Sequence, residues 1–297
     1  MRVIFMGTPD FAVPSLEALL TKHEVVLVVT QPDKPKGRGK KMVPTPVKAC
    51  ALEHGIPVLQ PEKVKEPEFV EQLRSYEPDL IAVTAFGQIL SEPILEMPKY
   101  GCINVHGSLL PKYRGAAPMQ WSIIDGEKVT GITTMYMAKG LDSGDMLLKA
   151  EVEITDEDTF ATIHDKMAVT GANLLLDTLD QLEAGTLERI PQDHDAATYA
   201  PMITKETGHI DWSKNRQDII NLIRGLNPVP AAYTIYEEEV LKIFGAVISD
   251  VQADDAANGE IVAVVKKGFV VKCGDGCLLI TEAVSYTHLT LPTTSRV

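Results

Sequence analysis

Short apolar runs alternate with helical patterns through the first part of the chain, and this alternation constrains the fold most. Four runs bounded by Gly, Pro or polar residues are predicted strands, at 3–5, 25–29, 80–85 and 102–105. Apolar residues spaced three or four apart between them predict helices, for example over 47–54 and 69–76. Strands that alternate with helices form a mostly parallel sheet with helices on both faces. The first domain is therefore expected to be an α/β domain.

The pattern changes after a long predicted helix that follows Thr159 and stops at Gly185. Residues 190–207 contain prolines and lack periodicity, so they are predicted to be a linker. A short helix is expected from Ser213. Closely spaced strands then predict a small β-barrel, with runs at 232–236, 240–248, 260–265, 268–273 and 277–281.

These patterns divide the chain into a first domain over 1–189, the linker, and a second domain over 208–284. The last residues, 285–297, have neither helical spacing nor strand alternation. We expect them to be a foreign or unstructured tail and leave them out of the fold prediction.

Composition narrows the class of protein. With 297 residues, 45% of them apolar and 23% charged, the chain is an ordinary globular sequence that can bury two cores. No apolar run reaches the ~18 residues of a membrane helix, and the N-terminus resembles no secretory signal or transit peptide. We therefore expect a cytoplasmic protein that does not bind membranes. The net charge of −13 excludes an overall basic surface but not a local RNA-binding patch.

Four cysteines are too few for a disulfide scaffold in a chain of this size. Cys50 and Cys102 lie in apolar surroundings and are predicted core residues. Cys273 and Cys277 flank a Gly-Asp-Gly sequence, which predicts a hairpin turn. A metal site would need two more ligands nearby, and none is evident, so no metal is expected.

Three polar residues occur where predicted strands run into loops. Asn104 and His106 are two apart and can face the same way, and Asp142 lies between glycines in a later loop. Asn supplies an amide donor, His a proton acceptor near neutral pH, and Asp a negative charge that can orient the His. Each residue alone also has a structural explanation, as a hydrogen-bonding His, a turn Asn or a capping Asp. Together they suit acyl-type transfer to an amine.

Residues 104–115, NVHGSLLPKYRG, resemble the folate-dependent formyltransferases. The resemblance covers residues 1–284. It extends to MGTPDFA at 6–12, TQPD at 30–33, GRGKK at 37–41, GLDSGD at 140–145, IDW at 210–212 and RGLNP at 224–228. It implies a Rossmann-like domain followed by a smaller OB-like barrel. Members of the family continue past Val284 into further barrel strands, so the barrel is expected to be incomplete.

The basic loop and the second domain resemble the member of this family that acts on initiator tRNA. The resemblance implies that a monomer transfers the formyl group of 10-formyltetrahydrofolate to the α-amine of methionine on that tRNA. Negative charge then grows on the carbonyl oxygen, and Asn104 is expected to donate to it. His106 is expected to stabilise the oxygen or handle the proton, and Asp142 to orient His106 and assist proton movement.

The resemblance also implies a folate site in which apolar walls and backbone polar groups hold a flat, edge-polar pterin. Its expected residues are Phe86, Gly87, Gln88, Ile89, Leu90, Ser108, Leu109, Leu110 and Pro111. Ser108 is expected to be a loop or ligand contact, because an amine nucleophile needs no acylated serine. For Ile89 and Leu90, core packing remains an equal alternative.

The loop after Asp33 is basic and contains no further acid. Its expected tRNA-binding residues are Lys34, Lys36, Arg38, Lys40 and Lys41. A charged run is usually solvated surface, but phosphate neutralisation by a basic loop releases counterions and binds RNA. Arg38, between two glycines, is expected to enter the acceptor stem.

Three other functions remain open. A formyltransferase acting on glycinamide ribonucleotide or an amino-sugar nucleotide would share Asn104, His106 and Asp142, but the basic loop and second domain favour tRNA. A non-catalytic tRNA-binding protein is disfavoured because these three residues are all present. A nicotinamide-dependent oxidoreductase is disfavoured because the glycine fingerprint is missing.

Overall fold

The computed structural model describes residues 1–36 and 41–285, which form two compact units. The first unit consists of Met1–Gly115, Thr130–Val152 and His164–Tyr199. The second consists of Ala116–Val129, Glu153–Ile163 and the chain from Ala200 onward. Two short segments from the middle of the chain thus pack with its C-terminal part.

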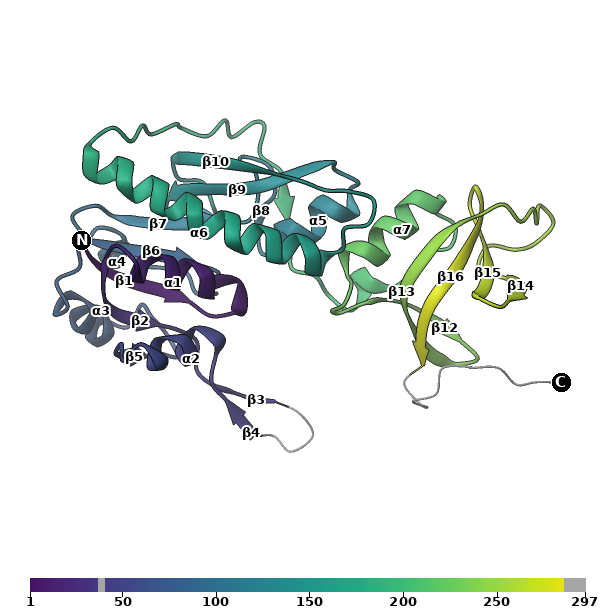
Figure 1. Ribbon diagram of the computed structural model, residues 1–297, viewed down its shortest axis with the longest axis horizontal. Coiled ribbons are helices and arrows are strands. Elements are labelled where there is room, and N and C mark those ends of the chain that lie inside the picture. Colours follow the sequence, from purple (N-terminus) through teal and green to yellow (C-terminus); the bar gives the residue numbers. More distant parts are fainter. Residues whose placement is uncertain (37–40, 286–297) are drawn as a thin grey trace. The chain divides into compact units, whose positions relative to one another are not determined.

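The first unit is built on a seven-stranded sheet with the order β10-β9-β7-β6-β1-β2-β5 (Figure 1). The strands are β1 (Arg2–Gly7), β2 (Glu24–Val29), β5 (Val58–Leu59), β6 (Leu80–Thr84), β7 (Cys102–His106), β9 (Val129–Tyr136) and β10 (Met146–Glu153). Strands β5, β2, β1, β6 and β7 are parallel, and β9 is antiparallel to β7. The predicted mostly parallel sheet and its four predicted strands are confirmed.

Strands β9 and β10 were not predicted from the sequence. Strand β9 is interrupted by a glycine and by threonines, yet Thr130, Thr133 and Thr134 are buried. Their burial is possible because hydroxyls find partners: Thr133 Oγ1 donates to the Ser108 carbonyl oxygen at 2.7 Å, and Thr134 Oγ1 shares a hydrogen bond of 2.8 Å with Thr178 Oγ1. Hydrophobic periodicity does not detect a buried strand of this kind.

The helical elements of the first unit are η1 (Asp10–Ala12), α1 (Val13–Leu20), α2 (Pro46–Glu53), α3 (Pro67–Arg74), α4 (Glu92–Leu95) and most of α6 (Phe160–Ala184). Helix α6 packs closely on the sheet at Gly171, where an added Cβ would lie 2.9 Å from the Val105 side chain of β7. A continuous core joins strand residues such as Ile4 and Ile81 to Leu73 of α3.

A short antiparallel hairpin, β3 (Lys34–Lys36) and β4 (Lys41–Val43), extends from this unit (Figure 1). The short strands β8 (Arg114–Gly115) and β11 (Tyr199–Ala200) also pair with each other. Among the described helices, none has both the length and the apolar character needed to cross a membrane.

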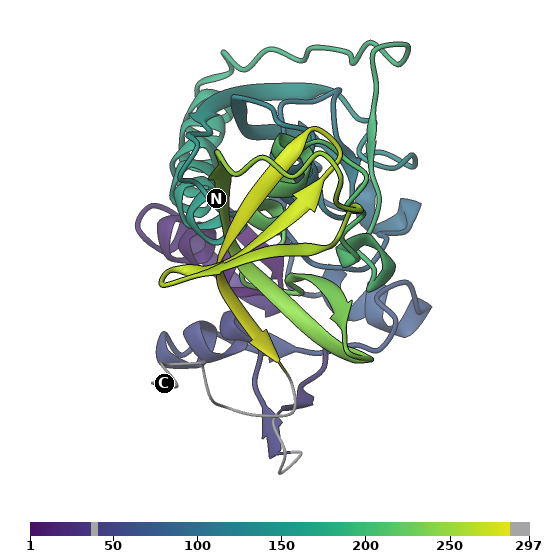
Figure 2. The same ribbon diagram turned by 90° about the vertical axis from the view of Figure 1, so that its right-hand side faces the viewer.

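The second unit contains α5 (Pro118–Ile124), η2 (Glu206–Gly208), α7 (Arg216–Gly225) and a five-stranded antiparallel sheet. The sheet order is β12-β13-β16-β15-β14, and Figure 2 shows its strong twist. The strands are β12 (Ala232–Tyr236), β13 (Glu239–Ser249), β14 (Ile261–Val265), β15 (Gly268–Cys273) and β16 (Gly276–Ser285). The fold class and all five predicted strands are confirmed.

The turn between β15 and β16 confirms the predicted hairpin, because Cys273 pairs with Gly276 across it. All four cysteines are free and buried. Burial raises the pKa of the Cys102 thiol to about 12. Cys50 and Cys102 are therefore core residues, as predicted. The predicted tail is 285–297; its first residue, Ser285, ends β16, and 286–297 lie outside the described residues.

Candidate active site

Asn104 and His106 lie on β7, with neighbouring strands on both sides. Asn104 is opposite Val83 of β6 and Met135 of β9. Since residues two apart on a strand point to the same face, the amide and the imidazole share one side of the sheet. His106 is only 6% exposed, whereas Asn104 is half-buried. Within residues 1–36 and 41–285 the Asn104 side chain makes no hydrogen bond, so its amide is available to a ligand.

The His106 ring lies between two oxygen atoms. Its Nε2 is 3.0 Å from the Tyr113 carbonyl oxygen, and its Nδ1 is 3.7 Å from Asp142 Oδ2. A carbonyl oxygen only accepts, so the proton of the first contact is on Nε2. The second contact is longer than a hydrogen bond but places the carboxylate directly beside Nδ1. The structure therefore brings the predicted His106 and Asp142 together.

Asp142 lies in the loop between β9 and β10, the two strands that the sequence did not reveal. Its backbone adopts a left-handed conformation, with φ of 45°, which is uncommon for a residue other than glycine. Its Oδ2 accepts a hydrogen bond of 2.8 Å from the Gly115 backbone nitrogen. Two residues on, Gly144 has no room for a side chain, because a Cβ there would collide with the Tyr136 carbonyl oxygen. The loop is thus tightly shaped around the carboxylate.

The predicted folate residues 108–111 form a compact loop after β7. Ser108 is fully buried, and its hydroxyl donates to the Lys112 carbonyl oxygen at 2.6 Å. Leu110 is 1% exposed and packs with Met135 and Met146. The Ser108 hydroxyl and the Leu110 side chain therefore hold the loop in shape. The side chains of Leu109 and Pro111 are half-buried.

The Leu110 carbonyl oxygen also has a charged partner. Lys149 Nζ, on β10, donates to it at 2.6 Å. Partial burial lowers the pKa of this ammonium group. The contact ties the loop after β7 to the strand that follows the Asp142 loop.

The predicted folate residues 86–90 differ among themselves. Phe86 and Leu90 are 2% and 5% exposed and belong to the core, whereas Ile89 is 85% exposed. Core packing therefore accounts for Leu90 but not for Ile89. The Gln88 side chain accepts from the Val64 backbone nitrogen at 2.8 Å and holds the neighbouring loop. Gly87 has a φ of 83°, which permits the turn between these residues.

Only part of the predicted tRNA-binding loop lies within the described residues. Lys34 is exposed on β3. Arg38 and Lys40, and the side chains of Lys36 and Lys41, lie outside the described residues.

Three side chains, those of Asp33, Lys48 and Gln60, are hydrogen-bonded to one another next to the start of the β3–β4 hairpin. Lys48 Nζ contacts Asp33 Oδ2 at 2.6 Å and Gln60 Oε1 at 2.7 Å. Hydrogen bonds from Lys48 and Gln60 lower the pKa of the Asp33 carboxyl group. The acid at the start of the basic loop is therefore paired with a lysine of α2.

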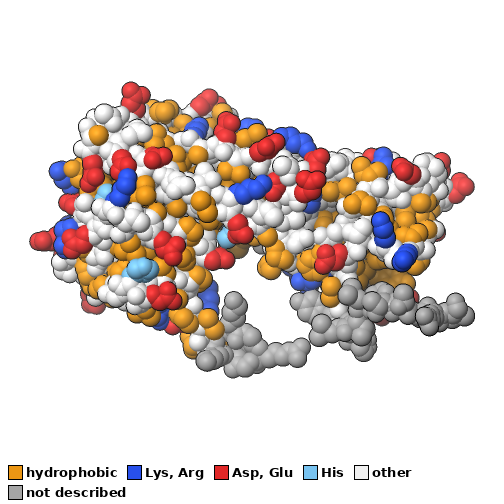
Figure 3. Space-filling view, in the orientation of Figure 1, with side chains coloured by type: hydrophobic (Ala, Val, Ile, Leu, Met, Phe, Trp, Pro, Cys, Tyr) orange, Lys and Arg blue, Asp and Glu red, His pale blue; other side chains and the backbone are white. Residues whose placement is uncertain are grey.

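Charge elsewhere on the surface is mixed. Figure 3 shows acidic and basic side chains interspersed on one face.

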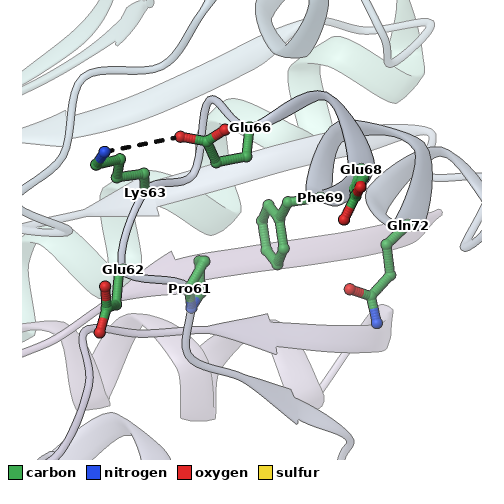
Figure 4. A pocket seen from close by; sticks show the side chains of 7 residues that line it. All are labelled: Pro61, Glu62, Lys63, Glu66, Glu68, Phe69 and Gln72. Atoms are coloured by element: carbon green, nitrogen blue, oxygen red, sulfur yellow. Dashed lines mark ion pairs between the residues drawn. The ribbon is translucent and has the colours of Figure 1, made fainter.

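A surface pocket lies over α3 and the preceding loop, where the Phe69 ring points toward Pro61 (Figure 4). Carboxylates of Glu62, Glu66 and Glu68 also line it, and none of the predicted site residues does. The described residues contain no group of three His, Cys, Asp or Glu side chains that could hold a metal ion.

Sequence reasoning missed two polar residues beside the Asp142 loop. Arg114 is 3% exposed, and its Nε and Nη2 donate to Gln192 Oε1 at 3.0 and 2.7 Å. Gln192 is 6% exposed, and its Nε2 donates to the carbonyl oxygens of Asp142 and Gly144, both at 2.8 Å. Arg114 stood inside the quoted motif and could have been singled out. Gln192 lies in the predicted linker, where no local pattern marks it.

Comparison with protein families places two matches along the chain. Residues 1–179 match the family described as formyl transferase, and residues 202–286 match the formyl transferase C-terminal domain. The chain is 57% identical over 284 residues to the methionyl-tRNA formyltransferase of Ruminiclostridium cellulolyticum. It is 55% identical over 283 residues to that of Acetivibrio thermocellus. Each alignment covers 95% of this chain and 91% of the relative.

A solved structure shares the fold at lower identity. It is the N-formyltransferase from Helicobacter canadensis, in complex with folinic acid and dTDP-3-aminofucose. The TM-score is 0.68 at 19% identity, with 96% of this chain and all (100%) of that chain covered. At this identity the likeness establishes the fold alone.

Proposed function

This chain belongs to the formyl transferase family, and from that premise we propose that it formylates the α-amine of methionyl initiator tRNA with 10-formyltetrahydrofolate. The observation that carries the proposal is the 57% and 55% identity, over 95% of the chain, to two methionyl-tRNA formyltransferases. The pairing of His106 with Asp142 supports it independently. A sugar-directed enzyme shares only the fold, so a small amine is the weaker candidate acceptor.

In the proposed reaction the amine nitrogen bonds to the formyl carbon, and the bond from that carbon to the folate nitrogen breaks. Negative charge develops on the formyl oxygen as the amine attacks. Asn104 is half-buried and its amide has no partner among the described residues, which suits donation to that oxygen. A preorganised donor of this kind is typically worth ~10²–10³ in rate.

The attacking amine must lose a proton, and the folate nitrogen must gain one. His106 keeps its Nε2 proton on the Tyr113 carbonyl oxygen, so Nδ1 is the ring atom that can receive the proton. Asp142 Oδ2, 3.7 Å away, then faces a positively charged ring and stabilises it. A positioned acid–base group contributes ~10²–10⁴ in rate.

The binding assignments follow the same proposal. Folate is proposed to contact the loops at 86–90 and 108–111, through backbone groups and the half-buried Leu109 and Pro111. The domain at 1–189, which holds Asn104, His106 and Asp142, would carry the chemistry. The basic loop after Asp33 and the domain at 208–284 would bind tRNA, with the protein acting as a monomer.

The test is formyl transfer by the purified protein from 10-formyltetrahydrofolate to methionyl initiator tRNA. Uncharged tRNA, glycinamide ribonucleotide and dTDP-3-aminofucose serve as alternative acceptors. We expect transfer to the charged tRNA only, and a drop of ~10²-fold or more in Asn104→Ala. Transfer to an amino sugar or a ribonucleotide, with none to methionyl-tRNA, would refute the proposal.

A further inference from the structure

We infer that Arg114 and Gln192 are positioning residues that hold the Asp142 carboxylate beside His106. The consequence for catalysis rests on the proposed function, whereas the structural part of the inference does not. Neither residue touches the proposed reacting atoms, and both act through the Asp142 loop.

Arg114 carries a charge that is almost completely removed from solvent. Only 3% of the residue is exposed, and it forms no ion pair with any residue of 1–36 or 41–285. Its guanidinium instead donates to Gln192 Oε1 through two nitrogens and to His194 Nδ1 at 3.0 Å. A buried charge is costly without such bonds, so the rigid fork fixes its partners in place.

The arginine also decides which way the Gln192 amide is turned. A guanidinium only donates, so the oxygen of the amide must face Arg114. The amide nitrogen then points the other way and donates to the Asp142 and Gly144 carbonyl oxygens, on both sides of Ser143. If the guanidinium were absent, the buried amide oxygen would lose both its donors, and only the contacts to the Asp142 and Gly144 carbonyl oxygens would hold the amide.

The Asp142 loop needs this support because its backbone is strained. A φ of 45° at a residue with a side chain persists only where surrounding contacts impose it. Gln192 holds the Asp142 backbone from one side, and the Gly115 nitrogen holds the carboxylate from the other.

Residues 113–115 therefore order both members of the His–Asp pair. The Tyr113 carbonyl oxygen fixes the His106 ring, and the Gly115 nitrogen fixes the Asp142 carboxylate. Arg114, between them, reaches the Asp142 backbone through Gln192. Three consecutive residues therefore fix the two groups that lie 3.7 Å apart, His106 Nδ1 and Asp142 Oδ2.

The sharpest variant is Gln192→Glu. Its carboxylate still accepts from Arg114, so the buried charge keeps a partner, but it can no longer donate to the Asp142 and Gly144 carbonyl oxygens. We expect kcat to fall by ~10–100-fold, with little change in the KM values, because misplacing a catalytic group by about 1 Å can cost ~10²-fold. Arg114→Met should give a similar loss, and Arg114→Lys, which can still donate to Gln192, a smaller one. The matched control is Arg74→Met, which removes an exposed arginine of α3.

A double-variant test separates positioning from a general loss of structure. If Arg114 acts through Asp142, Arg114→Met should lower the residual kcat of Asp142→Asn little or not at all, whereas independent effects would multiply. Equal fold-losses in both backgrounds, or parental kcat in folded Gln192→Glu, would overturn the inference.

Amide hydrogen exchange measures how well the Asp142 loop is ordered, and it does not depend on the reaction. The Tyr136 backbone nitrogen donates to the Asp145 carbonyl oxygen at 2.9 Å, across the base of the loop. Exchange over 136–145 should rise in Gln192→Glu and not in Arg74→Met, and unchanged exchange would contradict the inference. If the parent protein fails to formylate methionyl-tRNA, the proposed function fails and this measurement still decides the structural role. If Arg114→Met does not fold, Gln192→Glu and Arg114→Lys decide it.

Discussion

Two arginines, one in each unit, are held by hydrogen bonds, but the groups that accept these bonds differ. Arg224 of α7 donates to the carbonyl oxygens of Asp158 and Thr155 at 2.8 and 2.7 Å. Arg114 donates to side chains, and Gln192 carries the contact on to the Asp142 loop. Arg224 therefore connects a backbone segment to helix α7 directly. Arg114 instead acts through Gln192 on the Asp142 loop, which lies beside His106.

The charged surroundings of the two arginines differ. Desolvation lowers the pKa of Arg224, and the nearby Asp156, Asp158 and Glu157 oppose that shift. Arg114 has no such acidic surroundings among its hydrogen-bond partners. Arg224 is half-buried, whereas Arg114 is buried. The comparison teaches that the groups accepting an arginine's hydrogen bonds tell whether it ties backbone segments together or aligns a catalytic pair.

The largest loss of kcat is expected at Asp142, the last residue in the series of contacts that begins at Arg114. Asp142→Asn should lower kcat by ~10³–10⁴-fold, because it removes the negative charge that faces the protonated His106 ring. The amide can still accept from the Gly115 nitrogen, so the unfolding midpoint should stay near that of the parent protein. Single-turnover kinetics and circular dichroism measure both. A near-parental kcat would exclude the proposed catalytic role of Asp142. It would also exclude the proposed positioning role of Arg114 and Gln192.

A third arginine, Arg38, sharpens the comparison because it is expected to contact a partner molecule. Arg38→Ala should raise the KM for methionyl-tRNA by ~10-fold and leave tetrahydrofolate binding unchanged, since loss of a phosphate contact weakens RNA binding. The salt dependence of tRNA binding should become less steep by about one counterion. Equal tRNA kinetics and salt dependence in Arg38→Ala and the parent would exclude this role.

Arg224→Met should separate stability from catalysis. Two backbone carbonyls lose their donor, so we expect the second unit to lose about 2 kcal/mol in its free energy of unfolding. At saturating substrates, kcat per folded molecule should be unchanged. Urea denaturation and turnover on the same preparation test this. A large loss of kcat with unaltered stability would show that Arg224, like Arg114, acts on catalysis and not on stability.

The smallest effect concerns His23, which lacks the partners that both arginines have. Its two ring nitrogens are buried without a hydrogen bond within the described residues. Burial lowers its pKa, the N-terminal amine and Lys22 add to this, and Glu183 and Asp180 oppose it. The folded protein thus prefers the neutral ring, so this contribution to stability is complete above a pH of about 6.5 and is lost as pH falls through the lowered value.

His23→Leu should remove that dependence. Its denaturation midpoint should fall less than that of the parent between about pH 7.5 and pH 5.5. Urea titrations at the two pH values give the comparison. An identical pH dependence in the two proteins would mean that protonation of His23 does not affect folding.

Much of the fold could be predicted because its signals are local. The runs at 3–5 and 102–105 are apolar and bounded by turn residues, and the 25-residue helix α6 follows directly from its spacing of leucines. The two-residue period of a strand also places Asn104 and His106 on one face without knowledge of the fold. Strand β9 could not be predicted in this way, because buried threonines hide its apolar face.

The amino-acid sequence alone determined the chemistry of the candidate site: an amide, an imidazole and a carboxylate, each next to turn-forming residues. Only the tertiary structure decided that Asp142 meets His106, and that Arg114 meets Gln192 across 78 positions of the chain. The physical reason is range. Strand and helix periodicity depends on neighbouring residues, whereas the partner of a buried polar group depends on the path of the whole chain.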